Sequence, residues 1–156
     1  MFEGLLLEAE SEGIEVINHS FKNLNLKGLY VDGVIILNPA AIHTTAEKNC
    51  ILAEEIGHHH SSFGNILDQK NIVKRKQEYY GKKWAYQKLV PLTSFVSAFN
   101  AGVRNRFEFA EHLGITERFL DNAISYYIEK HGLYHSFDGK HLIYFDPLGV
   151  ALMFED

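Results

Sequence analysis

Two Asp-Gly dipeptides, each set between β-rich runs, constrain the fold of this chain more than any other feature. The runs LKGLYV and VIILNP flank Asp32-Gly33. This dipeptide favours the tight type I′ turn of a β-hairpin, in which both turn residues need a positive φ. Asp138-Gly139 stands in the same way between LYHSF and KHLIYF. The sequence therefore predicts two hairpins, one early and one near the C-terminus.

Helical patterns fill most of the remaining chain. We expect a short helix over residues 2–13, a strand over 14–21, a helix through AEKNCILAEEIGHHH, another over about 70–90, and two helices within 107–131. Thr44 or Thr45 would cap the second of these helices. The fold class is α+β: a small antiparallel sheet packed against a helix, then a helix-turn-helix-like region and a C-terminal β-hairpin.

Composition excludes several functional classes. A net charge of −5 argues against attraction of the whole chain to nucleic acid or anionic lipid. The lone cysteine, Cys50, cannot form an internal disulfide, which favours a reducing cytoplasm. Residues 1–15 carry five glutamates and no basic residue, so we expect no signal peptide. No apolar run approaches the ~20 residues that a membrane span needs.

The stretch CILAEEIGHHH holds the strongest chemical signal. It reads like the zinc-protease motif H-E-x-x-H with a glutamate at the first histidine. Positions i and i+4 share one face of a helix, so Glu54 and His58 project together and could bind one metal ion. Glu55 would then be the general base that activates a metal-bound water. Carboxylate ligands tilt such a site from Zn²⁺ toward Mn²⁺ or Mg²⁺.

The same letters also occur on ordinary solvated helices, and a third ligand must come from elsewhere. Glu78 follows His58 by twenty residues and is the one acid among seven bases between Lys70 and Lys88. Asp68 lies in the intervening segment. Glu78 could equally be an ion-pairing residue on a basic surface helix. The sequence leaves the choice between Glu78 and Asp68 open.

AEEIGHHH followed by KQEYYGKKWAYQKLVP resembles the core of the ImmA/IrrE metallo-endopeptidases. The family pattern is H-E-x-x-H, then a helix with E-x-x-A-x-x-(F/W)-A that ends in a leucine and a proline. Glu78, Trp84-Ala85 and Pro91 fit the later part, whereas Gly81 replaces the first alanine of the pattern. The resemblance covers most of the chain and is strongest over residues 44–91.

The resemblance implies roles for individual residues and a class of substrate. His58 and Glu78 match the family's zinc ligands, and Glu55 matches its base; Glu54 departs from the pattern. Family members cleave or inactivate a partner repressor, often in prophages. The resemblance thus implies a cytoplasmic, prophage-type zinc endopeptidase acting on a repressor-like protein. The alternative is a non-catalytic antirepressor that binds its partner through the same fold, with a degraded metal site.

The rest of the chain carries weaker signals. FAEHLGITERFLDNAISYYIEKHG resembles a helix-turn-helix, but residues 107–131 hold five acids and two bases, a poor match to phosphate contacts. We therefore expect no DNA binding, and packing or partner docking instead. We assign residues 1–93 to a zincin-like metallopeptidase core and residues 94–156 to a C-terminal region that packs on it. Residues 94–102 are the best candidate for a boundary segment.

Overall fold

The computed structural model describes residues 1–61 and 71–153. Within this part the chain forms two compact units, Met1–Ala85 and Tyr86–Asp156. The boundary between them lies inside a helix, eight residues before the boundary that we predicted at residue 93. The predicted division of function between the two parts stays a prediction.

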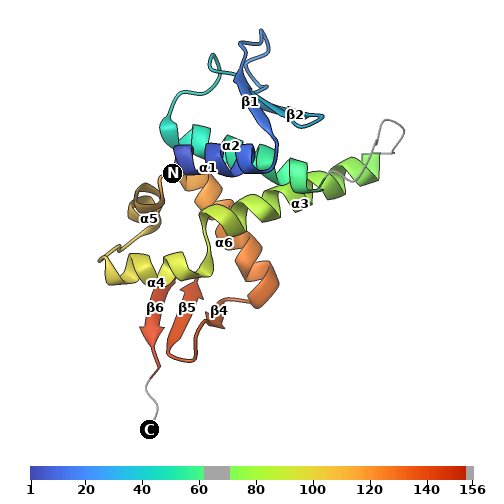
Figure 1. The fold of residues 1–156 in the computed structure, drawn as a ribbon. Helices are drawn as coiled ribbons and strands as arrows, with labels where there is room; N and C mark the ends of the chain where they lie inside the picture. The colour runs from blue at the N-terminus through green and yellow to red at the C-terminus, as the bar shows by residue number, and fades with distance from the viewer. Residues whose placement is uncertain (62–70, 154–156) are drawn as a thin grey trace. The chain divides into compact units, whose positions relative to one another are not determined.

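The N-terminal unit packs a three-stranded sheet on two helices. Its elements are α1 (Phe2–Ser11), β1 (Glu15–Asn18), β2 (Gly28–Val31), β3 (Val34–Leu37), α2 (Thr45–Ser61) and the first part of α3 (Asn71–Leu89). Figure 1 shows α1 lying beside α2, with the strands on the same part of the unit. Leu5 and Ala9 on α1, with Leu52 and Ile56 on α2, are among the buried side chains. Removing such apolar surface from water stabilises the unit by about 25 cal/mol per Å².

The first predicted hairpin is confirmed as β2 and β3, which pair antiparallel. Asp32 and Gly33 have φ of 47° and 80°, the positive values that a type I′ turn requires. The sheet order is β1-β3-β2, and β1 runs parallel to β3, so this sheet is mixed rather than purely antiparallel. Strand β2 therefore forms one edge of the sheet and faces α2.

The C-terminal unit combines helices with a second three-stranded sheet. It contains the end of α3, then α4 (Leu92–Asn100), α5 (Arg106–Leu113), α6 (Glu117–His131), β4 (Tyr134–Ser136), β5 (His141–Phe145) and β6 (Leu148–Leu152). The predicted split of residues 107–131 into two helices is confirmed: Gly114 ends α5 in a left-handed conformation, and the Thr116 hydroxyl caps α6 by accepting a hydrogen bond from the Phe119 amide. Phe95, Phe109 and Phe145 pack edge to face in the core.

Two elements of this unit differ from the prediction. The candidate boundary segment, residues 94–102, begins as helix α4, whose Phe95 and Ala98 are buried. The second hairpin is confirmed as β4 and β5 around Gly139, but a third strand, β6, pairs with β5. Helix α4 packs against β5 and β6, so burial against this sheet explains why the segment is helical.

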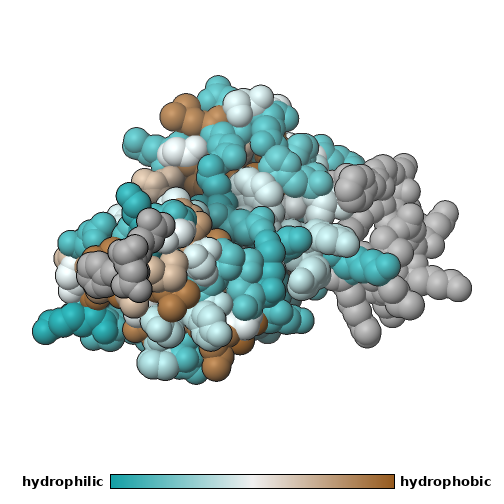
Figure 2. Space-filling model, turned by 90° about the horizontal axis from the view of Figure 1, so that it is seen from below, coloured by the Kyte–Doolittle hydropathy of each residue, from teal (hydrophilic) through white to brown (hydrophobic). Residues whose placement is uncertain are grey.

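No helix in the described part of the chain combines the length and the apolar composition that crossing a membrane requires. In Figure 2, hydrophilic residues cover much of the visible face, and the hydrophobic residues form separate patches between them.

Candidate metal centre

The predicted site residues of α2 lie in the second half of one continuous helix. The Thr44 hydroxyl accepts a hydrogen bond from the Glu47 amide at 3.1 Å, which caps the helix at its N-terminus. Cys50, Ala53 and Ile56 are buried in the core, whereas Ile51 is half-buried. Because the helix continues to Ser61, the i+4 relation that the motif needs is maintained throughout.

Glu55 and His58 form the central polar contact of the site. Oε2 of Glu55 lies 3.0 Å from Nδ1 of His58, and Glu55 is only 8% exposed. A carboxylate accepts hydrogen bonds and does not donate them, so Nδ1 carries the proton. Gly28 on β2 makes room for this carboxylate, because a Cβ at residue 28 would lie 3.2 Å from Oε1 of Glu55.

The other ring nitrogen of His58, Nε2, is buried. Among the described residues, Nε2 of His58 has no hydrogen-bond partner. The ring lies against α3 at Gly81, where a Cβ would clash with Cδ2 and lie 3.1 Å from Nε2. One residue earlier on α2, a Cβ at Gly57 would clash with the Gly81 carbonyl oxygen. The two helices approach so closely because both contact positions are glycine.

The electrostatics link four of the predicted residues. Burial raises the pKa of Glu54 above its usual value; nearby Lys82 opposes the shift, while the charges of Glu55 and Glu78 add to it. Burial alone would lower the pKa of His58, but the hydrogen bond that its Nδ1 donates to Glu55 and the neighbouring carboxylates raise the pKa overall. Glu54, Glu55, His58 and Glu78 therefore lie within each other's electrostatic reach. Lys82 is a counter-charge that sequence reasoning missed.

The described residues do not form a finished metal cage. No group of three or more His, Cys, Asp or Glu side chains in this part of the chain lies in an arrangement that could hold a metal ion. Glu78 is exposed on α3, and Asp68 lies outside the described residues. The set of Glu54, His58 and Glu78 is thus not preassembled, and its role as ligands stays a prediction.

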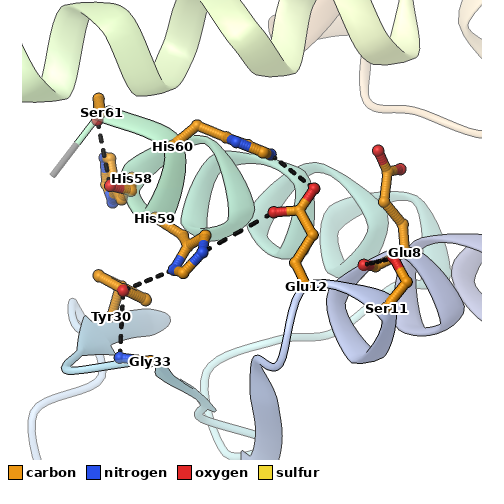
Figure 3. A network of polar contacts seen from close by, with 9 residues as sticks. All are labelled: Glu8, Ser11, Glu12, Tyr30, Gly33, His58, His59, His60 and Ser61. Carbon is orange, nitrogen blue, oxygen red and sulfur yellow. Dashed lines mark hydrogen bonds and ion pairs between the residues drawn. The ribbon is translucent and has the colours of Figure 1, made fainter.

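The neighbouring histidines point elsewhere and hold the helix in place (Figure 3). Nδ1 of His59 lies 2.7 Å from the Tyr30 hydroxyl on β2, and that hydroxyl also accepts the Gly33 amide hydrogen bond at 3.1 Å. Nε2 of His60 lies 3.1 Å from a Glu12 carboxylate oxygen just after α1. Adjacent residues of a helix point about 100° apart, so His59 and His60 do not share the face of Glu54 and His58. Sequence reasoning had no signal for Glu12 or Tyr30, which are distant in sequence.

The Glu55–His58 pair on α2 follows Glu54 and packs against α3, the helix that carries Glu78. This part of the chain is similar to a known protein family. Residues 9–125 match the family model described as the IrrE N-terminal-like domain, peptidase M78. The chain belongs to this family. No match was found among curated proteins or among solved structures.

Membership of the IrrE N-terminal-like family makes this a metallopeptidase-type domain. The match takes in α2, α3 and most of α6, and it ends before β4, β5 and β6. The resemblance found in the sequence is therefore confirmed at the level of the family. Glu54 stands where the H-E-x-x-H motif has its first histidine.

Proposed function

We propose that the chain is a zinc-dependent endopeptidase of the ImmA/IrrE type that cleaves or inactivates a repressor-like protein. The observation that carries the proposal is the His58 ring. Its Nδ1 is held by Glu55 at 3.0 Å, and its Nε2 is buried with no hydrogen-bond partner in the described part of the chain. Metal-binding histidines commonly donate one ring N–H to a carboxylate and present the other nitrogen to the metal.

The donor types fit a divalent metal. His58 offers an imidazole nitrogen, and Glu54 and Glu78 offer carboxylate oxygens, which are ligand types of Zn²⁺ and, for a carboxylate-rich set, of Mn²⁺ or Mg²⁺. The His58 ring lies against Gly81 of α3, the helix that also carries Glu78. A bound metal would polarise a peptide carbonyl and make water easier to deprotonate.

In this proposal Glu55 carries out the proton transfers of the reaction. Oε2 of Glu55 orients His58, so Oε1, the oxygen beside Gly28, is the atom placed to take a proton from the attacking water. Glu55 would then pass that proton to the leaving amine, as a general base that becomes a general acid. The burial of Glu55 excludes bulk water from this proton transfer and strengthens its electrostatic contacts.

A second candidate is the non-catalytic antirepressor. It is favoured by the lack of a preassembled group of metal ligands among the described residues and by the glutamate at the first motif position. On this reading the Glu55–His58 pair only stabilises α2 against its neighbours, and the protein relieves repression by binding.

Metal analysis of the purified protein by elemental mass spectrometry tests the proposal. The protein is prepared with zinc supplied and without chelators, beside Glu54→Ala, His58→Ala and Glu78→Ala. About one metal ion per chain, lost in all three variants, is the expected result. His112→Ala, at an exposed position of α5, should keep the metal. A metal-free wild-type protein would refute the peptidase and favour the antirepressor.

Glu55→Gln separates the two functions once a metal is found. The variant keeps an oxygen that can accept the His58 hydrogen bond but cannot take a proton. We expect it to retain the metal and to lose cleavage of a random peptide library, read out by mass spectrometry. Cleavage at the wild-type rate would exclude Glu55 as the base.

A further inference from the structure

A cavity opens beside the candidate metal centre, between α2 and α3. Its volume is about 330 Å³, and it is lined by Gly57, His60, Ser61, Tyr80 and Trp84. This size is at the small end of the range of ligand sites, about 300–1,000 Å³. Gly57 directly precedes His58, so the cavity adjoins the residue that carries the proposed function.

The walls of the cavity are made by two different kinds of helix face. Gly57 and Ser61 are four residues apart on α2, and Tyr80 and Trp84 are four residues apart on α3, so each pair lies on one face of its helix. Small residues therefore face aromatic ones, which leaves the space open. The aromatic wall would meet a side chain that enters between the helices.

Contacts of His60 hold the aromatic wall of the cavity in position. The His60 ring stacks on the Trp84 indole with centroids 4.9 Å apart and an interplanar angle of 29°. Glu12 fixes the His60 ring through the contact of 3.1 Å to Nε2, as Figure 3 shows. A preorganised wall lowers the cost of ordering side chains when a ligand binds.

The chemistry of the lining favours an aromatic guest over a charged one. None of the described lining residues is acidic, and the Glu12 carboxylate is engaged by the His60 ring, so a cationic guest would find aromatic faces but no counter-charge in the lining. Aromatic side chains gain about 0.5–1.5 kcal/mol from stacked or edge-to-face pairs beyond the burial of their area. Tyr80 and Trp84 offer such faces.

The surroundings of the cavity on α3 favour acidic residues beside that guest. Lys76 precedes Tyr80 by four residues and Lys83 follows it by three, so both flank Tyr80 on the helix surface. Lys76 is exposed and Lys83 half-buried. Positive charges at these positions would attract carboxylates on either side of a bound aromatic residue.

We propose that this cavity is a side-chain subsite for a large aromatic residue in an acidic segment of the protein substrate. The inference deepens the proposed function, on which the word substrate rests. The aromatic side chain inserts between α2 and α3, and its acidic neighbours pair with the lysines of α3. The subsite thus selects which segment of a protein lies next to His58.

The fluorescence of Trp84 reports on the cavity directly, because this is the only tryptophan in the chain. The probe is an acetylated, amidated peptide with one phenylalanine between pairs of glutamates, titrated into metal-free protein so that cleavage cannot occur. A saturable change in the tryptophan spectrum is expected. Replacing the phenylalanine by alanine should weaken binding by about tenfold. Replacing the glutamates by lysines, or adding salt, should also weaken it.

Two adjacent tyrosines supply a matched pair of variants. Tyr80 lines the cavity and is 49% exposed, whereas Tyr79 is 52% exposed and is not among the lining residues. Both can be truncated with little effect on folding, because each side chain is already half in water. Tyr80→Ala should weaken binding of the phenylalanine peptide by about tenfold, and Tyr79→Ala should leave it unchanged.

The results separate this inference from the proposed function. Binding with the expected preferences supports the subsite even if metal analysis finds no metal, in which case only the peptidase fails. Absence of saturable binding, equal binding of the alanine peptide, or equal effects of the two tyrosine variants would overturn the subsite. A preference for the lysine peptide would overturn the assignment of an acidic partner.

Discussion

Because α2 and α3 approach closely at two glycines, we predict that replacing one of them by alanine destabilises the protein, although the same replacement usually stabilises a helix. Replacing glycine by alanine inside a helix ordinarily stabilises a protein by roughly 0.5–1 kcal/mol, because alanine loses less backbone freedom on folding. At Gly57 the added Cβ would clash with the Gly81 carbonyl oxygen and lie 2.8 Å from the carbonyl carbon of that residue. These are backbone atoms, so no side-chain rotation can relieve the clash.

The expected cost follows from these two opposing effects. Overpacking a close-packed contact costs typically about 1–3 kcal/mol, and a clash with backbone belongs at the upper end of that range. Subtracting the gain in helix propensity of about 1 kcal/mol leaves Gly57→Ala less stable by about 2 kcal/mol. The residue before His58 would also move away from α3.

Urea unfolding followed by Trp84 fluorescence measures this cost, since the indole lies on α3 next to the contact. Gly4→Ala is the matched control: Gly4 is an exposed glycine of α1 with no atom within 4 Å of an added Cβ. This variant should gain up to about 1 kcal/mol. If Gly57→Ala were as stable as Gly4→Ala, the close approach of the two helices would be refuted.

Three further predictions concern other positions. Gly81→Ala would push a Cβ into the His58 ring, so the ring should turn away from Glu55. Because that carboxylate raises the pKa of His58, the pKa should fall in an NMR titration. An unchanged pKa would show that the ring lies elsewhere. Burial and the nearby Tyr126 raise the pKa of Tyr127 above its ordinary 10.0, so the stability linked to the neutral phenol is present below pH 10 and is lost as the pH rises further. Tyr127→Phe should remove this alkaline loss in urea titrations, at a cost of about 1 kcal/mol for the hydrogen bond of 2.7 Å to the Val90 carbonyl. The His141 ring and the amides of Lys140 and His141 lower the pKa of Asp138 from 3.8 to about 2. The stabilisation of the folded state by the ionised Asp138 carboxylate is therefore lost as the pH falls through that range. In His141→Gln, an NMR titration of this carboxyl group should give a pKa closer to 3.8.

Local signals made the elements of the fold predictable. Asp32-Gly33 determines its hairpin because the turn needs two positive φ values, and Thr116 and Gly114 mark helix ends through caps that involve only their near neighbours. The parallel pairing of β1 with β3 carries no such signal, since a strand pattern does not specify its partner. Helix α4 was missed for a similar reason: its helical state depends on burying Phe95 against a sheet that is distant in sequence.

The site was predictable only as far as helix geometry reaches. The i+4 relation of Glu54 and His58 follows from the sequence alone. The Glu55–His58 hydrogen bond and the counter-charge of Lys82 do not, because they depend on side-chain rotamers and on the packing of α3 against α2. The contacts of Glu12 and Tyr30 with the neighbouring histidines likewise required the tertiary structure.

Two residues border the His58 imidazole at positions where the sequence resemblance leads one to expect others. Glu54 lies one helical turn before His58, where the H-E-x-x-H motif has a histidine, and Gly81 lies on the next helix. An alanine at residue 81 would clash with the His58 ring where it now lies, so the hydrogen bond to Glu55 depends on the glycine. The carboxylate of Glu54 adds a negative charge that raises the pKa of His58, and Lys82, one residue after Gly81, partly offsets that charge at Glu54. Glu54 and Gly81 therefore act on the same side chain, and an alanine at residue 81 would displace the His58 ring whichever residue stands at position 54.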